Sequence, residues 1–258
     1  MSSGDFSRRV AQRFAGAAAS YDAHSAAQRH AAQQLARRIF TRQLPPGPRI
    51  LEIGCGTGHL TEFLARQLPA AEILATDIAP EMVAACRARL AQHAQLSCAV
   101  MDGAHPAVAG PFDLICGNLV AQWFDDLPGA CTRLSALLAP GGVLALCLPG
   151  GETFREWRAA HTRLDLIPGT LPLPTPEACR AALPAGGNAH IETELWLDRP
   201  HSGLDFLRSL RAIGANTPAP GHIPLPPAQL RRVLRELGTK PAFTYELIYL
   251  LWQHRETL

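Results

Sequence analysis

The chain has 258 residues, of which 47% are hydrophobic and 18% are charged. This composition excludes a disordered protein and predicts a packed core, large enough for one α/β domain or two small ones. The 24 basic and 22 acidic residues give a formal net charge of +2, which is too small to attract nucleic acid or an anionic membrane.

The patterns of cysteines, histidines and apolar residues bear on the cell compartment, on metal sites and on membrane helices. The seven cysteines include no C-x-x-C pair, which favours reduced thiols over a disulfide scaffold or a zinc ribbon, and the ten histidines form no H-E-x-x-H pattern. No apolar run reaches the roughly 18 residues that a membrane helix needs. Residues 1–10 lack the hydrophobic core of a signal peptide. We therefore expect a cytoplasmic protein with no metal, no nucleic-acid partner and no membrane contact.

The first 44 residues are expected to form an N-terminal helical arm. Residues 10–40 are rich in Ala, Gln and Arg and carry large apolar anchors such as Phe14 and Leu35. Gly16 and the following run to Asp22 are a candidate interruption. The sequence LPPGP at positions 44–48 breaks the helix and ends the arm.

Residues 45–150 alternate short apolar strands with helices. The predicted strands are 49–53, 72–77, 95–101, 112–116 and 143–148, and the predicted helices are 58–68, 80–92 and 126–138. Strands without polar alternation, separated by helices, are typical of a mostly parallel sheet that is covered on both faces.

The regular alternation weakens in residues 151–258, which are expected to form an inserted helical cover over the substrate and the last strands. The predicted helices are 153–166, 202–213 and 227–237, the predicted strands are 191–197 and 243–252, and the proline-rich stretches 168–176 and 217–227 are expected to be loops. We therefore predict a single domain, residues 1–258, with a seven-stranded sheet of the Rossmann-like α/β class and a cofactor-binding core at 45–150.

A glycine-rich loop follows the first predicted strand. Glycines at such a strand-to-helix turn allow a tight turn and a close approach of a ligand to the backbone. Dehydrogenases use G-x-G-x-x-G there, but position 59 of this chain is His59, which we expect on a helix surface. The spacing of Glu52, Gly54, Gly56 and Gly58 instead resembles the E-x-G-x-G-x-G loop of class I S-adenosylmethionine-dependent methyltransferases.

Two acidic residues at the ends of later strands support a nucleoside site. Asp77 ends the second strand, where a carboxylate can accept hydrogen bonds from ribose hydroxyls. Asp102 follows the third strand, and the resemblance implies that it holds the adenine amino group. The cofactor predicted is S-adenosylmethionine, which leaves as S-adenosylhomocysteine. The residues predicted to bind it are Glu52, Gly54, Gly56, Gly58, Asp77, Ile78, Met82, Asp102, Gly103 and Asn118.

The segment after the fourth strand is expected to face the methyl group, because ligands of parallel sheets bind beyond the carboxyl ends of the strands. This segment contains no N-P-P-Y motif, which argues against amino-methylation of DNA bases or of protein glutamine. Gln122 and Trp123 offer N–H donors and no ionisable base, so we assign them to orienting an acceptor oxygen. For Trp123, a place in the hydrophobic core is the alternative.

Five segments carry a resemblance to one family: 10–14, 18–24, 118–123, 209–216 and 243–249. They are similar to those of the malonyl-acyl-carrier-protein O-methyltransferases of biotin synthesis. Segment 209–216 discriminates best, because general methyltransferases lack it. The resemblance covers nearly the whole chain and departs in the two proline-rich loops.

The resemblance implies methylation of the free carboxylate of malonyl-acyl-carrier protein, giving an ester that primes pimeloyl and biotin synthesis. Malonyl-coenzyme A remains open as a second acceptor. A carboxylate with a reference pKa near ~4 is ionised at pH 7, so no general base is needed. We expect the enzyme to contribute positioning and the exclusion of water.

Two hypotheses concern the acceptor. Arg211, with Arg208, is expected to bind the malonyl carboxylate, since the two lie three positions apart within a predicted helix and guanidinium groups suit carboxylates. Tyr21 and His24 share a helical face and are expected to close the arm over both substrates. The alternatives are an exposed arginine face and an arm that only packs on the core.

The acyl carrier protein is usually acidic, and three arginines of the predicted cover helix are candidates for docking it: Arg155, Arg158 and Arg163. A solvated charged face is the alternative. Three other functions compete with the malonyl interpretation: methylation of a different small carboxylic acid, of the trans-aconitate type, a non-catalytic binding protein with the same fold, and a nucleic-acid methyltransferase. The arginine-bearing segment 209–216 argues against a different carboxylic acid. The intact glycine loop argues against a non-catalytic protein, and the near-neutral charge argues against a nucleic-acid methyltransferase.

Overall fold

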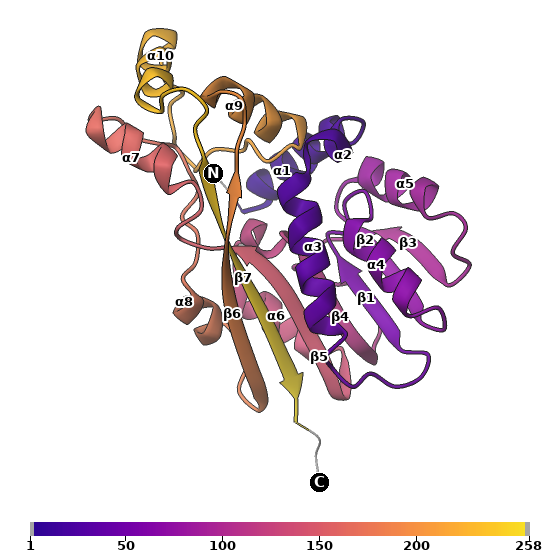
Figure 1. Cartoon of the computed structure of the whole chain (residues 1–258). Coiled ribbons are helices and arrows are strands. Elements are labelled where there is room, and N and C mark those ends of the chain that lie inside the picture. The colour runs from indigo at the N-terminus through magenta and orange to yellow at the C-terminus, as the bar shows by residue number, and fades with distance from the viewer. Residues whose placement is uncertain (1–2, 256–258) are drawn as a thin grey trace.

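A computed structural model describes residues 3–255, which form one seven-stranded sheet in the order β3-β2-β1-β4-β5-β7-β6 (Figure 1). The strands are β1 Arg49–Ile53, β2 Glu72–Asp77, β3 Leu96–Val100, β4 Phe112–Asn118, β5 Leu138–Pro149, β6 Gly187–Asp198 and β7 Phe243–His254. Neighbouring pairs among β1 to β5 are parallel, whereas β7 runs antiparallel to both β5 and β6. The predicted Rossmann-like, mostly parallel sheet is confirmed.

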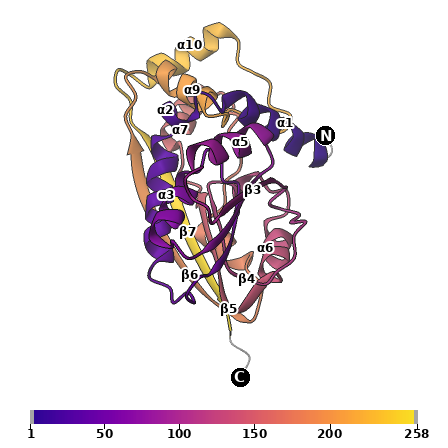
Figure 2. The ribbon, with the colours of Figure 1, turned by 90° about the vertical axis from the view of Figure 1, so that its right-hand side faces the viewer.

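Helices cover both faces of this sheet, as the side view in Figure 2 shows. They are α1 Ser3–Ala17, α2 Tyr21–His24, α3 Ala26–Ile39, α4 His59–Gln67, α5 Pro80–Arg89, α6 Leu127–Ser135, α7 Arg155–Arg163, α8 Pro176–Ala181, α9 Gly203–Ala212 and α10 Pro227–Glu236, with a 3-10 turn, η1, at Ala121–Trp123. One face packs its Val, Leu and Ile side chains under α3 and α4, and the other packs them under α6 and α8. The carboxyl ends of the parallel strands remain free for a site.

The arm is three helices rather than one. Helix α1 runs straight through Gly16, and the chain turns at residues 18–20 before the short α2 begins at Tyr21. The turn is held from outside, because the Ser20 hydroxyl donates to the Ala212 carbonyl at 2.8 Å, at the end of α9. A tertiary contact therefore determines where the predicted interruption falls.

Several predicted bounds were wrong in detail: the helix expected over 126–138 ends at Ser135, and the strand expected over 191–197 is longer, Gly187–Asp198. Strand β5 begins at Leu138 rather than at 143, and a register shift between Phe112 and Leu114 of β4 accommodates the Pro140-Gly141-Gly142 run that was expected to be a breaker. Helix α8 was not predicted. Its proline lies in the first turn and the Thr175 hydroxyl accepts the Ala178 N–H, so a stretch that looked like a pure loop ends in a capped helix.

Helices α7, α9 and α10 form a cover beyond one end of the sheet (Figure 1). The cover has a small core of its own, in which the Phe206 and Phe243 rings stack at 3.6 Å and Trp157 and Val233 are buried with them. Because Phe243 begins β7, the central sheet itself anchors the cover next to the carboxyl ends of the strands.

Candidate active site

The glycine loop between β1 and α4 leaves room for a ligand against the backbone. Gly54 has φ +64°, and a Cβ there would fall 2.4 Å from Val120 Cγ2, so only glycine fits. The Gly56 N–H donates to Asp77 Oδ2 at 3.0 Å, and the Cys55 N–H donates to the Thr76 carbonyl at 2.8 Å. The loop is thus pinned to the end of β2.

This loop forms one wall of a cavity of about 200 Å³, the cofactor cavity. Seven of the predicted cofactor residues line it: Gly54, Gly56, Asp77, Ile78, Asp102, Gly103 and Asn118. The other three lie behind the wall. Glu52 and Met82 are buried, and Gly58 packs α4 onto α5, since a Cβ on it would fall 3.0 Å from Cys86 Sγ. Burial raises the pKa of the Glu52 carboxyl well above its usual value.

Two carboxylates face the cofactor cavity from neighbouring strand ends. Asp77 accepts the Ala79 N–H at 2.9 Å, and burial raises its pKa despite such backbone hydrogen bonds. Asp102 accepts the Ala104 N–H at 2.9 Å through Oδ1, and its Oδ2 lies 3.1 Å from His105 Nδ1. Carboxylate oxygens here can accept hydrogen bonds from hydroxyl and amino groups, and the glycine cradle leaves space beside them. The residues present therefore fit a nucleoside.

A second cavity of about 320 Å³, the acceptor cavity, lies between the arm, η1 and the cover. Its walls are mostly aromatic and aliphatic, from Trp157 in α7 and Phe206 and Leu210 in α9. Among the described residues that line it there is no Asp, Glu, Lys or Arg, and His222 is the only side chain there that could carry a positive charge. The cavity therefore suits an acceptor that brings little charge or finds its counter-charge in another ligand.

Four side chains line both cavities: Phe14, Tyr21, Leu119 and Trp123. The Phe14 and Trp123 rings meet edge to face with centroids 5.7 Å apart. Burial, with Asp77 and Asp22 nearby, raises the pKa of Tyr21 well above its usual value, so its hydroxyl keeps its proton at neutral pH. This shared wall is where a group would pass from one cavity to the other.

The polar side chains at the end of β4 and in η1 have some atoms bonded to the backbone and others without a protein partner. The Gln122 amide donates to the Leu119 carbonyl at 2.8 Å, and the Asn118 amide donates to the Gln28 carbonyl at 3.0 Å. Gln122 Oε1, Asn118 Oδ1 and the Trp123 Nε1–H are buried without a protein partner. The indole N–H is the free donor of this group, whereas the Gln122 N–H donates to the backbone.

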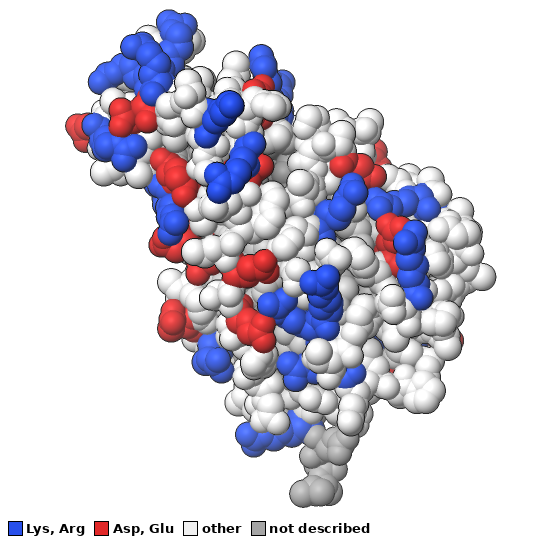
Figure 3. Space-filling model, in the orientation of Figure 1, with Lys and Arg blue, Asp and Glu red and all other residues white. Residues whose placement is uncertain are grey.

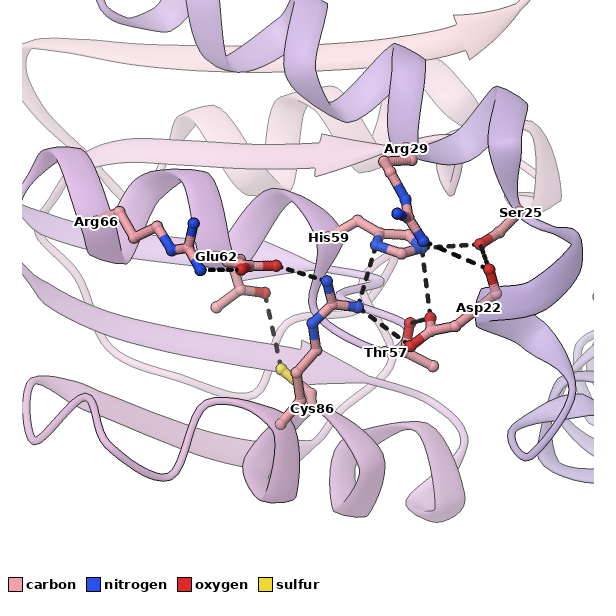
Figure 4. A network of polar contacts seen from close by, with 10 residues as sticks. Asp22, Ser25, Arg29, Thr57, His59, Glu62, Arg66 and Cys86 are labelled. Carbon is pink, nitrogen blue, oxygen red and sulfur yellow. Dashed lines mark hydrogen bonds and ion pairs between the residues drawn. The ribbon is translucent and has the colours of Figure 1, made fainter.

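A polar network fastens the arm to the glycine loop (Figure 4). Asp22 of α2 accepts the Thr57 hydroxyl at 2.5 Å, and its other carboxylate oxygen lies 3.2 Å from Arg89 Nη1. Arg89 also reaches Glu62 at 2.5 Å, so α2, the loop, α4 and α5 are joined through one guanidinium. Because Tyr21 precedes Asp22, this network also positions the shared wall.

His59 belongs to the same network and was expected on a helix surface. That prediction was wrong, since only 6% of His59 is exposed and its Nε2 lies 2.8 Å from the Ser25 hydroxyl. Burial and the nearby Arg89 lower the pKa of His59 to about 4. The imidazole is neutral at pH 7 and serves as a hydrogen-bonding spacer under the arm.

Three predicted acceptor residues lie away from the cavities. His24 is exposed on α2, and Arg208 and Arg211 are exposed on α9. Arg208 pairs with Asp205 at 3.1 Å. The side of α9 that faces the acceptor cavity is apolar and includes Leu207 and Leu210. The structure thus brings together Tyr21, Gln122 and Trp123 of the predicted acceptor set.

The residues that sequence reasoning missed come mostly from the arm and the cover. Phe14 was treated as a packing anchor, and neither Leu119 nor Thr217 was singled out. The pairing of Asp22 with Arg89 joins residues 67 positions apart, which no local pattern encodes. A signal was available for Phe14, Asp22 and Leu119, because each lies in a segment that carries the family resemblance, but not for Thr217 or Arg89.

Comparison with known proteins agrees with this architecture. Residues 51–144 match the methyltransferase domain family Methyltransf_12. A malonyl-[acyl-carrier protein] O-methyltransferase from Magnetococcus marinus is 40% identical over 250 residues, which are 95% of this chain and 92% of that protein. The chain belongs to the malonyl-[acyl-carrier protein] O-methyltransferase family.

One longer relative and one solved structure are also similar to this chain. The biotin biosynthesis bifunctional protein BioCD of Bordetella avium is 46% identical over 248 residues, covering 95% of this chain, which spans about half (52%) of that longer protein. The crystal structure of YcgJ from Bacillus subtilis has the same fold, with a TM-score of 0.64 at 16% identity, covering 87% of this chain and 99% of YcgJ.

Two other observations complete the description of this malonyl-[acyl-carrier protein] O-methyltransferase family member. Within residues 3–255, no helix has the length and apolar character needed to cross a bilayer. In that same range, no three His, Cys, Asp or Glu side chains converge as metal ligands would.

Proposed function

We propose that this protein transfers a methyl group from S-adenosylmethionine to the free carboxylate of malonyl-acyl-carrier protein, giving the methyl ester that primes pimeloyl and biotin synthesis. The observation that carries the proposal is the 40% identity, over nearly the full length of both chains, to a protein named for this reaction. The two adjoining cavities, one acidic and one neutral, support it.

In this proposal, Asp77 and Asp102 bind the ribose and adenine ends of the methyl donor, with the backbone of Gly54 and Gly56 against it. The donor supplies a methyl group on a positively charged sulfonium. The chain contributes position and the exclusion of water: Tyr21 and Trp123 lie where the two cavities meet, and the arm closes over them. The acceptor carboxylate is already ionised, so no residue needs to remove a proton.

We further propose that α10 receives the acidic carrier protein. The three arginines first considered are occupied: Arg155 pairs with Glu152 and Glu156, Arg163 pairs with Glu236, and Arg158 donates to backbone carbonyls. Basic side chains gather at the α10 end of the molecule (Figure 3). Arg231, Arg232 and Arg235 are exposed there, and none of them takes part in an ion pair among the described residues. Arg208 and Arg211 on α9 would extend this attraction outside the cavity.

Purified protein, S-adenosylmethionine and malonyl-acyl-carrier protein test the reaction directly, with the methyl ester detected by mass spectrometry. The same mixture with free trans-aconitate in competition tests the alternative acceptor. Preferential methylation of trans-aconitate would reject the malonyl assignment. Rescue of a biotin-requiring strain that lacks its own malonyl methyltransferase tests the role in the cell.

Charge reversal of Arg231, Arg232 and Arg235 to Glu tests the docking proposal. We expect a higher KM for malonyl-acyl-carrier protein and no change for malonyl-pantetheine, which has no acidic carrier, because the effect depends on the charge of the carrier. An equal change for both acceptors would contradict docking on α10.

A further inference from the structure

The acceptor cavity poses an electrostatic problem for the proposed function, on which this inference rests. A carboxylate that leaves water for a neutral cavity pays a large desolvation cost unless donors or an opposite charge compensate it. The arginines predicted for this task, Arg208 and Arg211, lie exposed on α9, and the described lining of the cavity contains no arginine or lysine. The compensation has to come from neutral groups, from His222, which also lines the cavity, or from the second substrate.

The cavity lining carries buried polar atoms that no protein group satisfies. They include the Thr217 Oγ1, the Asn216 Oδ1 and the Trp123 Nε1–H. Thr217 is 8% exposed, and nearly all buried polar atoms in folded proteins have a partner. Of these groups, the threonine hydroxyl and the indole N–H can donate, which is what a carboxylate requires.

Packing brings the Thr217 segment to the junction of the two cavities. A Cβ on Gly214 would fall 2.8 Å from the Arg13 carbonyl oxygen and 3.0 Å from Phe14 Cα, so the turn that leads to Thr217 lies directly on the arm. Phe14 lines both cavities and contacts Trp123 edge to face at 5.7 Å. The turn before Thr217 and the Trp123 ring therefore both pack on Phe14, and Thr217 and Trp123 both line the acceptor cavity.

We propose that the Thr217 hydroxyl and the Trp123 indole N–H hold the malonyl carboxylate, and that the positive sulfonium of the bound methyl donor, rather than an arginine, balances its charge. Neutral donors orient the anion without neutralising it, so the oxygen stays a better nucleophile than it would be against a guanidinium. The acceptor site is complete only when a cationic nucleoside occupies the cofactor cavity.

This charge arrangement also accounts for product release. The carboxylate oxygen forms a bond to the methyl carbon as the bond from that carbon to sulfur breaks, and the electron pair goes to sulfur. The carboxylate becomes a neutral ester and the sulfonium becomes a neutral thioether, so the attraction between the two ligands disappears. The apolar lining of the acceptor cavity suits the neutral ester. The described lining includes no arginine or lysine that would bind the charged substrate more tightly than the ester.

Binding without turnover tests the charge dependence. Malonyl-pantetheine is titrated calorimetrically into the wild-type protein loaded either with sinefungin, whose amine is cationic, or with neutral S-adenosylhomocysteine. We expect the affinity with sinefungin to be at least about tenfold higher, since the compensating charge is present only there. Equal affinity for the two complexes would overturn the proposal.

Two variants test the donors in the same titration. Thr217→Val keeps the shape and removes the hydroxyl, and Trp123→Phe keeps an aromatic ring and removes the N–H. Each is expected to weaken malonyl-pantetheine binding about tenfold, the usual scale for a hydrogen bond to a charged group, with Thr217→Ser restoring the affinity. An unchanged Thr217→Val, or a larger loss in Arg211→Gln, would refute the assignment. If the wild-type protein methylates malonyl-acyl-carrier protein in that case, the proposed function still stands.

Discussion

The linings of the two cavities differ in charge and in how far apart their residues lie in the sequence. The cofactor cavity has acidic side chains in its lining, among them Asp77, Asp102 and Asp126, whereas the described lining of the acceptor cavity has no Asp, Glu, Lys or Arg. Most of the first is local in the chain, from the glycine loop to the start of α6. The second draws on the arm, on η1 and on the cover, which are far apart in sequence. Under the proposed function, recognition of the nucleoside depends mainly on residues at the carboxyl ends of neighbouring strands, whereas recognition of the acceptor depends on the packing of distant segments.

The largest effect on the cofactor cavity is expected from Gly54→Ala. The new Cβ would fall 2.4 Å from Val120 Cγ2 at a backbone with φ +64°, so the loop has to move out of its cradle. We expect S-adenosylhomocysteine binding, measured by calorimetry, to weaken by more than about 100-fold. Gly186→Ala is the matched control, because Gly186 has φ +88° but nothing within 4 Å. Comparable loss of binding in both would mean that backbone strain, rather than the cradle, governs the site.

Asp77→Asn tests whether the cofactor cavity can be weakened without affecting acceptor binding. It preserves the shape of the side chain but removes the charge and one of the two oxygens that accept the Gly56 and Ala79 N–H groups, so nucleoside affinity should fall about 10- to 100-fold while malonyl-pantetheine recognition persists at saturating cofactor. Calorimetry and KM values measure the two effects. Asp113→Asn, at the other end of β4, is the control. A larger effect on the acceptor KM than on nucleoside binding would erase the distinction between the cavities.

The contact between Asp22 and Arg89 should affect both cavities, because it fastens the arm that lines them. Asp22→Asn and Arg89→Gln should each speed S-adenosylhomocysteine dissociation about three- to tenfold in stopped-flow measurements and raise the acceptor KM similarly. The double variant should be less than additive, since each substitution breaks the same contact. Arg87→Gln, on the same helix, is the control. Full additivity would indicate two independent effects.

The smallest effect concerns His59 and pH. Its pKa is about 4 in the folded protein and near 6.5 in an unfolded chain, so between these values the unfolded state binds a proton that the folded state does not. The free energy of unfolding should therefore rise with pH through this window, by about 0.7 kcal/mol from pH 6 to pH 7 on account of His59. Urea titrations of the wild type and of His59→Gln should differ by this slope. Parallel profiles would contradict the buried, neutral imidazole.

The difference between the two cavities also explains which site residues the sequence could predict. Apolar strands and spaced glycines reveal a parallel sheet and its cradle, because the physical requirements of a tight turn fall on adjacent residues. Seven of the ten predicted cofactor residues line the cofactor cavity for this reason. Glu52 and Met82 show the limit, since the spacing of residues on an element does not say which of them lie behind the wall.

Acceptor residues were harder to predict because their roles depend on tertiary packing. Arg208 and Arg211 have the right chemistry for a carboxylate, yet helix α9 turns its leucines to the cavity and leaves the arginines in water, as burial of an amphipathic helix requires. Thr217 lies in a proline-rich loop without periodicity. Its orphaned hydroxyl becomes apparent only once the arm has packed against the neighbouring turn.

The hydrogen bond from Ser20 to the Ala212 carbonyl, 2.8 Å long, lies between the α2 contact with the glycine loop and the turn that leads to Thr217. The arm therefore contributes Phe14 and Tyr21 to the lining of both cavities, and a movement of this segment would open both together. Spent nucleoside and finished ester would then depart during a single opening event. Under the proposed function, the frequency of that event would limit the turnover rate, however fast the methyl transfer is.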